Sequence, residues 1–183
     1  MHRIDSVVRN SLLQPRGYQR RIVAKAVAMF RGEFVHEQTK ELEAAASSVM
    51  IESPTGSGKT CMALTVAKAL QYDQPDLVIG WVAMRRNLLG QAARENQEKG
   101  INVKNIHFTS MFEKNPEELL TAKRKGKPIC MIIDEAQHDA ASSMSHLHNI
   151  IEPEAILGMT ATPFRTDKMK LCFQKVIKDC GIH

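Results

Sequence analysis

The sequence lacks the features that mark secreted, disulfide-bonded and membrane proteins. Its four cysteines form no C-x-x-C pair and lie far apart or within apolar runs, so neither a disulfide framework nor a zinc site is indicated. No apolar run approaches the roughly 18 residues needed to cross a bilayer, and the first ten residues, MHRIDSVVRN, contain no signal-peptide core. We therefore expect free thiols in a reducing compartment, the cytoplasm or a eukaryotic nucleus, with neither a membrane nor a structural metal as partner.

Repeats and low-complexity tracts are also absent, and the composition is that of one globular domain. The 183 residues are 43% hydrophobic and 25% charged, which is enough apolar material for a real core and argues against long disorder. The formal net charge of +5 suits a partner rich in phosphate, although many basic proteins bind no nucleic acid. Composition alone therefore leaves the function open.

Apolar patterning predicts alternating strands and helices. Short apolar runs predict strands at 49–51, 77–83, 103–108, 129–134 and 155–159. Apolar residues at helical spacing and helix-end signals predict helices at 59–70, 87–100, 115–126 and 167–181, with Asn115 as the cap and Pro116 as the first residue of the third. Residues 33–48 are interpreted as a solvated connection or a helix extension, and residues 135–149 as loop and helix. Such alternation indicates an α/β fold with a mostly parallel sheet, helices on both faces, and ligands bound at the carboxyl ends of the strands.

A phosphate-binding loop is indicated by the stretch SPTGSGKT, which starts at Ser53. It departs from the pattern G-x-x-x-x-G-K-[ST] only by a serine at the first position, which is tolerable if the backbone angles there are ordinary. The glycines allow backbone N–H groups to converge on phosphate oxygens, the lysine can reach the outer phosphates, and the threonine can ligate Mg²⁺. The alternative is a simple turn. The candidate nucleotide-binding residues of the loop are Pro54, Thr55, Gly56, Ser57, Gly58, Lys59 and Thr60.

A pair of acidic residues follows another predicted strand, in MIIDEAQHD. Asp134 could hold a hydrated metal ion, and Glu135 could orient or deprotonate an attacking water. Two acids after a strand are usually a solvated turn. Asp134 lies 75 residues after Lys59, which leaves room for the strands and helices of one nucleotide-binding sheet between the loop and the acidic pair.

Taken together, the loop, DEAQH and GMTATPFR resemble the first RecA-like domain of a superfamily 2 helicase or translocase of the DExH type. The resemblance runs from about Gln14 to about Arg165, and it is strongest to the branch shared by restriction-enzyme motor subunits and excision-repair helicases. A small residue at the Ser53 position is normal in that family. The resemblance implies a RecA-like P-loop domain over residues 1–183 that binds ATP and Mg²⁺ and couples hydrolysis to movement on nucleic acid.

The resemblance also implies roles for residues outside the loop and the acidic pair. In PRGYQRRIV, Arg16 and Gln19 are candidates to read the adenine base, and the alternative for this segment is a capped helix start. In WVAMRRNLLGQ, Met84 and Arg85 replace the usual proline and threonine, so a contact with the nucleic-acid backbone would come from Arg85 or Arg86. Thr109 in HFTSMFE is a weaker candidate for such a contact.

Two further motifs of the family concern coupling between ATP and nucleic acid. In MTATP, Thr160, Ala161 and Thr162 correspond to the motif that links hydrolysis to movement, although hydroxyls at a strand end often only cap turns. Gln137 takes the fourth position of the acidic box, where His or Asp is commoner. It can form hydrogen bonds across the domain cleft but cannot take a proton near neutral pH.

A complete motor of this kind closes two RecA-like domains around ATP, and the second supplies arginines. No second arginine motif follows in these 183 residues, so we expect a partner domain from elsewhere and weak or absent hydrolysis without it. DNA is favoured modestly over RNA. Three alternatives stay open: a small P-loop kinase, a non-catalytic nucleotide-binding module, and a motor that moves polypeptide.

Overall fold

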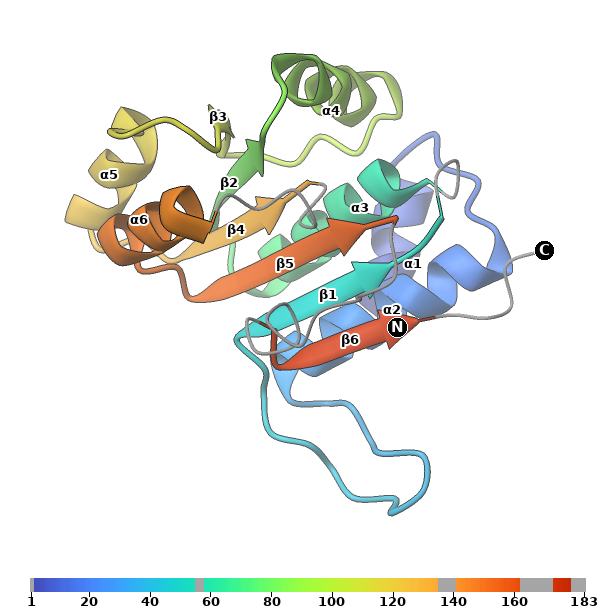
Figure 1. The fold of residues 1–183 in the computed structure, drawn as a ribbon. Helices are drawn as coiled ribbons and strands as arrows, with labels where there is room; N and C mark the ends of the chain where they lie inside the picture. Colours follow the sequence, from blue (N-terminus) through green and yellow to red (C-terminus); the bar gives the residue numbers. More distant parts are fainter. Residues whose placement is uncertain (1, 55–57, 135–140, 162–172, 179–183) are drawn as a thin grey trace.

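The protein folds around one parallel sheet, as Figure 1 shows. The computed structural model describes residues 2–54, 58–134, 141–161 and 173–178. Within them, six strands pair in the order β3-β2-β4-β5-β1-β6, and every pairing is parallel. The strands are β1 (Ser48–Glu52), β2 (Val78–Ala83), β3 (Ile106–Ser110), β4 (Ile129–Ile133), β5 (Ala155–Thr160) and β6 (Lys175–Lys178). In this described part, no helix has the length and apolar character needed to cross a membrane.

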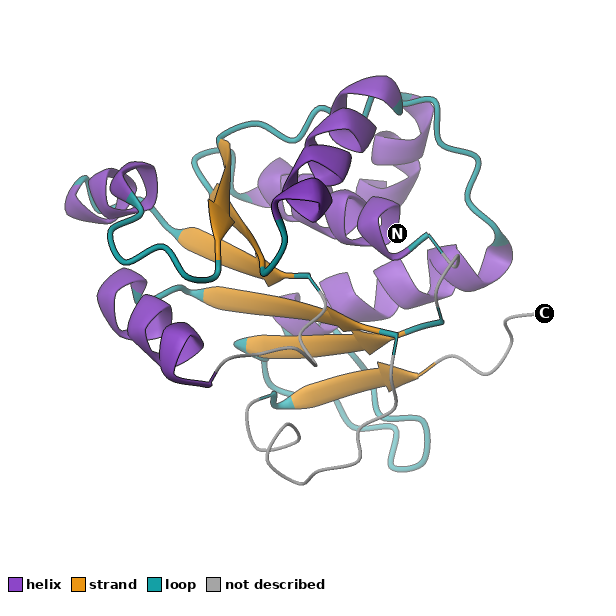
Figure 2. Ribbon diagram, turned by 45° about the horizontal axis from the view of Figure 1, so that its top comes forward, coloured by secondary structure: helices purple, strands orange, loops and turns teal. Residues whose placement is uncertain are grey.

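Helices cover both faces of the sheet, as predicted (Figure 2). Alternate residues of a strand point to opposite faces, so Val49 and Ile51 of β1 pack in one core cluster and Met50 packs in the other. The first cluster also contains residues of α1 (His2–Arg9), α2 (Gly17–Arg31), α3 (Lys59–Asp73) and α4 (Arg86–Glu98). The second contains residues of α5 (Glu117–Arg124) and α6 (Ala141–Ile151).

The predicted helix ends are partly confirmed. Gly100 follows α4 with a φ of 68°, the left-handed conformation that ends helices. Helix α5 begins at Glu117 with Pro116 in the cap position, so the assignment of Asn115 as the cap is wrong. The backbone N–H of Asn115 donates to Glu113 Oε1 (3.1 Å), which places Asn115 in the preceding turn.

Strand β3 begins three residues later than the 103–108 run predicts. Asn102 and Asn105 have φ angles of 55° and 52°, which extended chain does not allow. The side chain of Asn96 also binds the backbone of Val103 on both sides, accepting from its N–H at 2.8 Å and donating to its carbonyl at 3.2 Å. These local contacts delay the strand until Ile106.

The prediction of a helix over 167–181 is wrong where the structure can test it. Lys175–Lys178 forms the edge strand β6, which pairs in parallel with β1. Val176 and Ile177 are β-branched, which favours a strand, and the open edge of β1 supplies hydrogen-bond partners that a helical pattern cannot reveal. Of the residues placed on one helix face, Phe173 and Val176 pack against the α5–α6 side of the core, while Met169 and Cys180 lie outside the described residues.

Residues 33–47 form an exposed connection and do not extend α2, which ends at Arg31 and is followed by Gly32 with a φ of 69°. Val35 and Leu42 form an isolated antiparallel bridge within this connection. Glu43 forms an ion pair with Lys175 of β6, with 2.7 Å between Oε2 and Nζ. The connection extends from the body beside β6 (Figure 1).

We predict that replacing Leu119 by alanine lowers the free energy of unfolding by about 2–5 kcal/mol. Leu119 is fully buried, and its Cδ1 lies 2.9 Å from where a Cβ on Gly80 would stand, so α5 packs closely on β2 at this point. Urea denaturation followed by the fluorescence of the single tryptophan, Trp81, measures the change.

Leu120→Ala is the matched control, because the neighbouring Leu120 is only partly buried in the same helix. Its cost should be less than half as large, since both replacements change helix propensity equally. Equal costs would contradict the close packing of α5 on β2.

Candidate functional site

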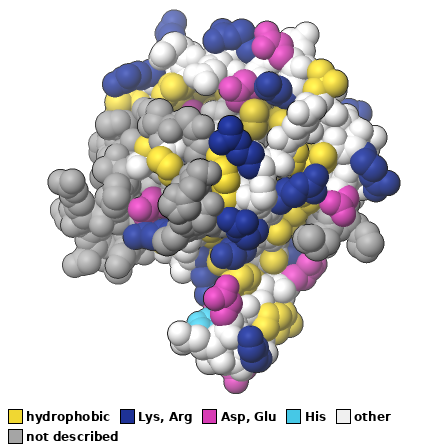
Figure 3. Space-filling model, turned by 90° about the vertical axis from the view of Figure 1, so that its right-hand side faces the viewer, with side chains coloured by type: hydrophobic (Ala, Val, Ile, Leu, Met, Phe, Trp, Pro, Cys, Tyr) yellow, Lys and Arg dark blue, Asp and Glu magenta, His cyan; other side chains and the backbone are white. Residues whose placement is uncertain are grey.

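Strand β1, which leads into the loop, and strand β4, which is followed by Asp134, end at the same edge of the sheet, with β5 between them. At this edge the Ser53 N–H donates to the Thr160 carbonyl (2.9 Å), and the Asp134 N–H donates to the Val82 carbonyl (2.8 Å). Asp134 is 6% exposed and Thr160 is fully buried. Figure 3 looks toward this edge, and lysine and arginine side chains lie across the centre of the view.

Ser53, the residue that departs from the loop pattern, has an ordinary backbone. It is not among the four described non-glycine residues with positive φ, so glycine is not required at this position. Ser53 is also buried, with 1% of its surface exposed. The condition stated for tolerating serine here is therefore met.

Of the two glycines of the loop, Gly58 is the one that the structure describes. It has a backbone conformation that only glycine adopts easily. Its φ is 84°, it precedes the first residue of α3, and an added Cβ would lie 2.5 Å from Gln19 Nε2. The positive φ is what favours glycine at position 58, since the Gln19 amide is the end of a flexible side chain and could move away from an added Cβ. Thr55, Gly56 and Ser57 lie outside the described residues.

Lys59 and Thr60 form the first turn of α3, where the positive end of the helix dipole lies. That turn contains no acidic residue, so no side chain of its own offsets the dipole. Lys59 Nζ donates to the Ser53 carbonyl at 3.2 Å, which holds the ammonium group over the start of the loop. Lys59 provides a cation, α3 provides a helix N-terminus, and Gly58 has no side chain to cover the backbone. Together these three features favour the binding of an anion with several oxygens.

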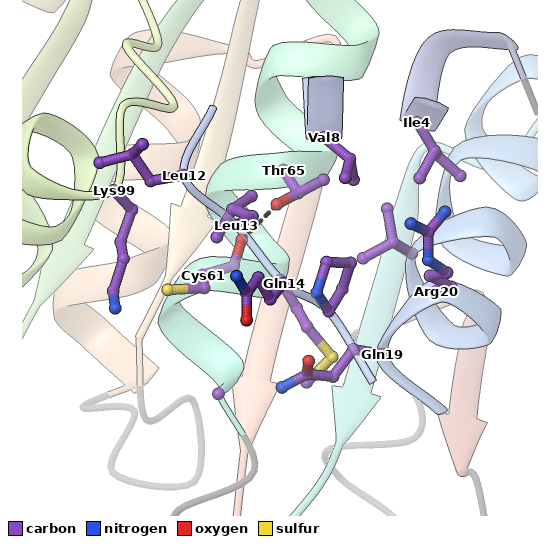
Figure 4. Close-up of a pocket in the computed structure, with 14 residues that line it drawn as sticks. Ile4, Val8, Leu12, Leu13, Gln14, Gln19, Arg20, Cys61, Thr65 and Lys99 are labelled. Atoms are coloured by element: carbon purple, nitrogen blue, oxygen red, sulfur yellow. Dashed lines mark hydrogen bonds between the residues drawn. The ribbon is translucent and has the colours of Figure 1, made fainter. Parts of the chain in front are cut away.

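A cavity of about 420 Å³ opens beside Gly58 (Figure 4). Its lining comes from α1, the segment before α2, the start of α2, α3 and the end of α4. Gln19 is part of the lining, and its Oε1 accepts from the Arg16 N–H at 2.8 Å, so it also caps α2. Arg16 does not line the cavity, although it was predicted together with Gln19.

Sequence reasoning missed the other side of this cavity, where Leu12, Cys61 and Lys99 lie. The Leu12 N–H donates to the Lys99 carbonyl at 2.8 Å, which fixes the segment before α2 to the end of α4. Cys61 Sγ lies 3.4 Å from Glu95 Oε2. The pKa of the Cys61 thiol is raised to about 12, mainly because the thiol is buried and secondly because the Glu95 carboxylate is near. The only sequence signal for this side of the cavity was the pair of apolar residues Leu12 and Leu13, two residues before Pro15.

A second hollow, of about 460 Å³, lies between α4 and β3. It brings together Arg86, the first residue of α4, and Thr109 of β3, two of the three residues predicted to contact nucleic acid. Gly90 and Ala93 also line it on the α4 side, and their small side chains leave the space open. Arg85 occupies the N-cap position of α4 in an extended conformation, without a capping hydrogen bond from its side chain, and is not part of this lining.

The predicted catalytic and coupling residues are described only in part. Asp134 and Thr160 lie at the shared edge of the sheet, and Ala161 follows β5 as a partly buried residue. Glu135, Gln137 and Thr162 lie outside the described residues. A hydroxyl in the first turn of α3 and a buried carboxylate at the end of β4 are oxygen groups of the kind that magnesium prefers, so Thr60 and Asp134 fit a magnesium site.

Comparisons with known proteins agree with this arrangement. The family model described as "Type III restriction enzyme, res subunit" matches residues 12–105 and 93–165. No curated protein matches the chain. Among solved structures, the chain is similar to the Hef helicase domain of Pyrococcus furiosus, with a TM-score of 0.60 and 16% identity over 89% of this chain and 38% of that one.

Two further solved structures share the fold. The UvsW helicase of bacteriophage T4 has a TM-score of 0.64 and 13% identity over 91% of this chain and 61% of that one. The SWI2/SNF2 ATPase core of Sulfolobus solfataricus, solved with dsDNA, has a TM-score of 0.57 and 16% identity over 84% of this chain and 33% of that one. The chain thus spans between a third and two thirds of these proteins.

The solved structures confirm the predicted RecA-like α/β fold. The family model agrees with the resemblance to restriction-enzyme motor subunits that the motifs indicated. Because the family model covers most of its length, the chain belongs to the family of type III restriction enzyme res subunits.

Proposed function

We propose that this chain is the ATP-binding RecA-like domain of a nucleic-acid helicase or translocase. The observation that carries the proposal is the strand order β4-β5-β1, which puts buried Asp134 at the same edge of the sheet as Gly58 and Lys59. Metal-dependent phosphate chemistry requires a carboxylate and a phosphate cradle at one edge. A kinase or a simple binding module would use the same loop, but the match to the res subunit family favours a motor.

ATP fits the loop and the cavity beside it. Lys59 would exchange its contact with the Ser53 carbonyl for the outer phosphate oxygens, and the N-terminus of α3 would face the same charge. The base would enter the cavity beside Gly58, where Gln19 offers an amide and the apolar residues offer a ring-sized surface. Thr60 and Asp134 would hold magnesium, which when bound offsets the charge of the phosphates.

Hydrolysis needs groups that follow two strands: the acidic residues after β4 and the coupling motif at the end of β5. We assign Glu135 the orientation or deprotonation of the attacking water, and Gln137 a hydrogen bond across the domain cleft. Thr160 to Thr162 would couple the nucleotide to the nucleic-acid side, since β5 lies between the loop strand and the acidic strand. A second RecA-like domain would supply the arginines that stabilise the transferring phosphoryl group.

Nucleic acid would bind at the hollow between α4 and β3. Arg86 provides a cation there, and Thr109 and Ser110 provide hydroxyls and backbone groups, which are typical partners of phosphates. Arg85 would add charge next to the helix start. The structure of the Sulfolobus ATPase core with dsDNA supports DNA as the partner.

Lys59→Ala should weaken the binding of Mg-ATP by about 10- to 100-fold and leave AMP binding unchanged, because the lysine reaches only the outer phosphates. Titration of the chain with the two nucleotides measures both affinities. Lys68→Ala is the matched control, since Lys68 lies in the same helix and donates to the Asn102 carbonyl at 2.9 Å. Equal losses for ATP and AMP would contradict the assigned role.

Arg86→Gln should reduce the slope of log K against log salt concentration by about 0.7 for single-stranded DNA, as expected when one phosphate contact is lost. Binding measured at several salt concentrations gives the slope. Arg124→Gln is the control, because Arg124 is exposed in the last turn of α5, near the amino ends of the strands. An unchanged slope for Arg86→Gln would remove Arg86 from the interface.

The chain alone should release phosphate from ATP no faster than its Lys59→Ala variant, with or without DNA. The arginines of a second domain are worth about 10³ to 10⁵ in rate, and their absence leaves the transition state unsupported. A phosphate-release assay on both proteins tests this. DNA-stimulated hydrolysis by the chain alone, abolished by Lys59→Ala, would show that no second domain is needed.

A further inference from the structure

The turn that follows β3 presents an exposed aromatic ring beside the nucleic-acid hollow. The Glu113 N–H donates to the Ser110 carbonyl at 3.0 Å, which closes a four-residue turn with Phe112 at its third position. Ser110 and Glu113, the two ends of the turn, both line the hollow that contains Arg86. Phe112 is 53% exposed, and its Cα is separated by only about 3.8 Å from that of Glu113. Phe112 itself does not line the hollow, but the turn that carries this exposed residue borders it.

The turn is held firmly from below. Met111 is fully buried, and its N–H donates to the Ala83 carbonyl at 2.9 Å, so it anchors the turn in the core. The Phe112 N–H donates to Ser110 Oγ at 3.2 Å. The wall beneath is equally well packed, because Phe108 contacts Trp81 with 6.4 Å between ring centroids. Because the backbone of the turn is anchored, Phe112 loses little backbone entropy when its ring binds a flat partner.

Exposure alone would not distinguish Phe112, since single apolar residues are common on protein surfaces. The other exposed aromatic residue in the described part of the chain is Tyr72, whose hydroxyl accepts from Asn10 Nδ2 at 3.4 Å. The Phe112 side chain has no polar atom, and the hollow bordered by its turn contains one arginine, two hydroxyl groups and the carboxylate of Glu113. The arginine and the hydroxyl groups are suited to phosphate. A ring and a phosphate-binding groove side by side match the two chemical parts of a nucleotide in a single strand.

We propose that Phe112 stacks on a base of single-stranded nucleic acid while the hollow at Arg86 holds the adjoining backbone. This inference rests on the proposed function and deepens it, because a stacked base must be unpaired. A duplex hides the faces of its bases except at its ends, so the turn and the hollow would favour single strands. Stacking reads the face that all bases share, so it carries no sequence preference.

The test compares an oligothymidylate with an oligomer of the same length that contains abasic sites, using fluorescence anisotropy. Phe112→Ala should weaken binding of the oligothymidylate by about 5- to 100-fold and leave binding of the abasic oligomer unchanged. Its salt slope should also stay unchanged, because no phosphate contact is lost. Tyr72→Ala is the control for an exposed aromatic residue elsewhere and should change neither affinity.

A second variant keeps the ring and reports on it directly. Phe112→Trp should retain affinity, and its exposed indole should lose fluorescence when the oligothymidylate binds but not when the abasic oligomer binds. The native Trp81 is fully buried and should not respond, and Tyr72→Trp controls for an exposed indole outside the turn.

The outcomes separate this inference from the proposed function. Failure of the unmodified chain to bind either oligomer would overturn the nucleic-acid site and the stacking together. Binding in which Phe112→Ala has no effect, or weakens both oligomers equally, would overturn the stacking and leave the site at Arg86 intact. Quenching of Phe112→Trp by both oligomers would also overturn it.

Discussion

The hydrogen bond from the Ser53 N–H to the Thr160 carbonyl joins the two strand ends on which the proposed nucleotide site depends. It continues the parallel pairing in which Glu52 of β1 lies opposite Thr160 of β5. The register of this pairing fixes where the loop leaves the sheet. The Asp134 N–H is held in the same way by the Val82 carbonyl of β2. Because all the described strands are parallel, these ends lie at one edge of the sheet, which brings together the residues proposed to bind phosphate and metal and to couple hydrolysis to movement.

Helix α4 takes part in both candidate sites. Its first residue, Arg86, lines the hollow proposed for nucleic acid, and Lys99, directly after its last residue, lines the cavity proposed for the base. The bond from Leu12 to the Lys99 carbonyl and the contact of Cys61 with Glu95 attach the far end of the helix to the cavity wall. The two sites are therefore connected by one rigid element as well as by the sheet.

Several parts of the fold were predictable because their signals are local. The loop, α3, β2, β4 and β5 follow from contiguous apolar runs and glycines, and Gly100 ends α4 as predicted. The errors have two causes. Lys175–Lys178 follows a helical pattern yet forms a strand because β1, far away in the sequence, is available to pair with it. Nearer in the sequence, contacts that the apolar pattern does not reveal delay β3, through Asn96 and Val103, and place Asn115 in the turn before α5.

The sequence by itself determined which groups the candidate site can offer, because the order Gly58-Lys59-Thr60 and the position of Asp134 after an apolar run are set by covalent neighbours. It also carries the family match over residues 12–105 and 93–165. Only the tertiary structure decided which groups come together: Asp134 at the same edge of the sheet as the loop, Gln19 over Gly58, Arg86 and Thr109 around one hollow, and Leu12 bonded to Lys99. Such meetings depend on strand order and helix packing, which sum many weak contacts between residues far apart in the chain.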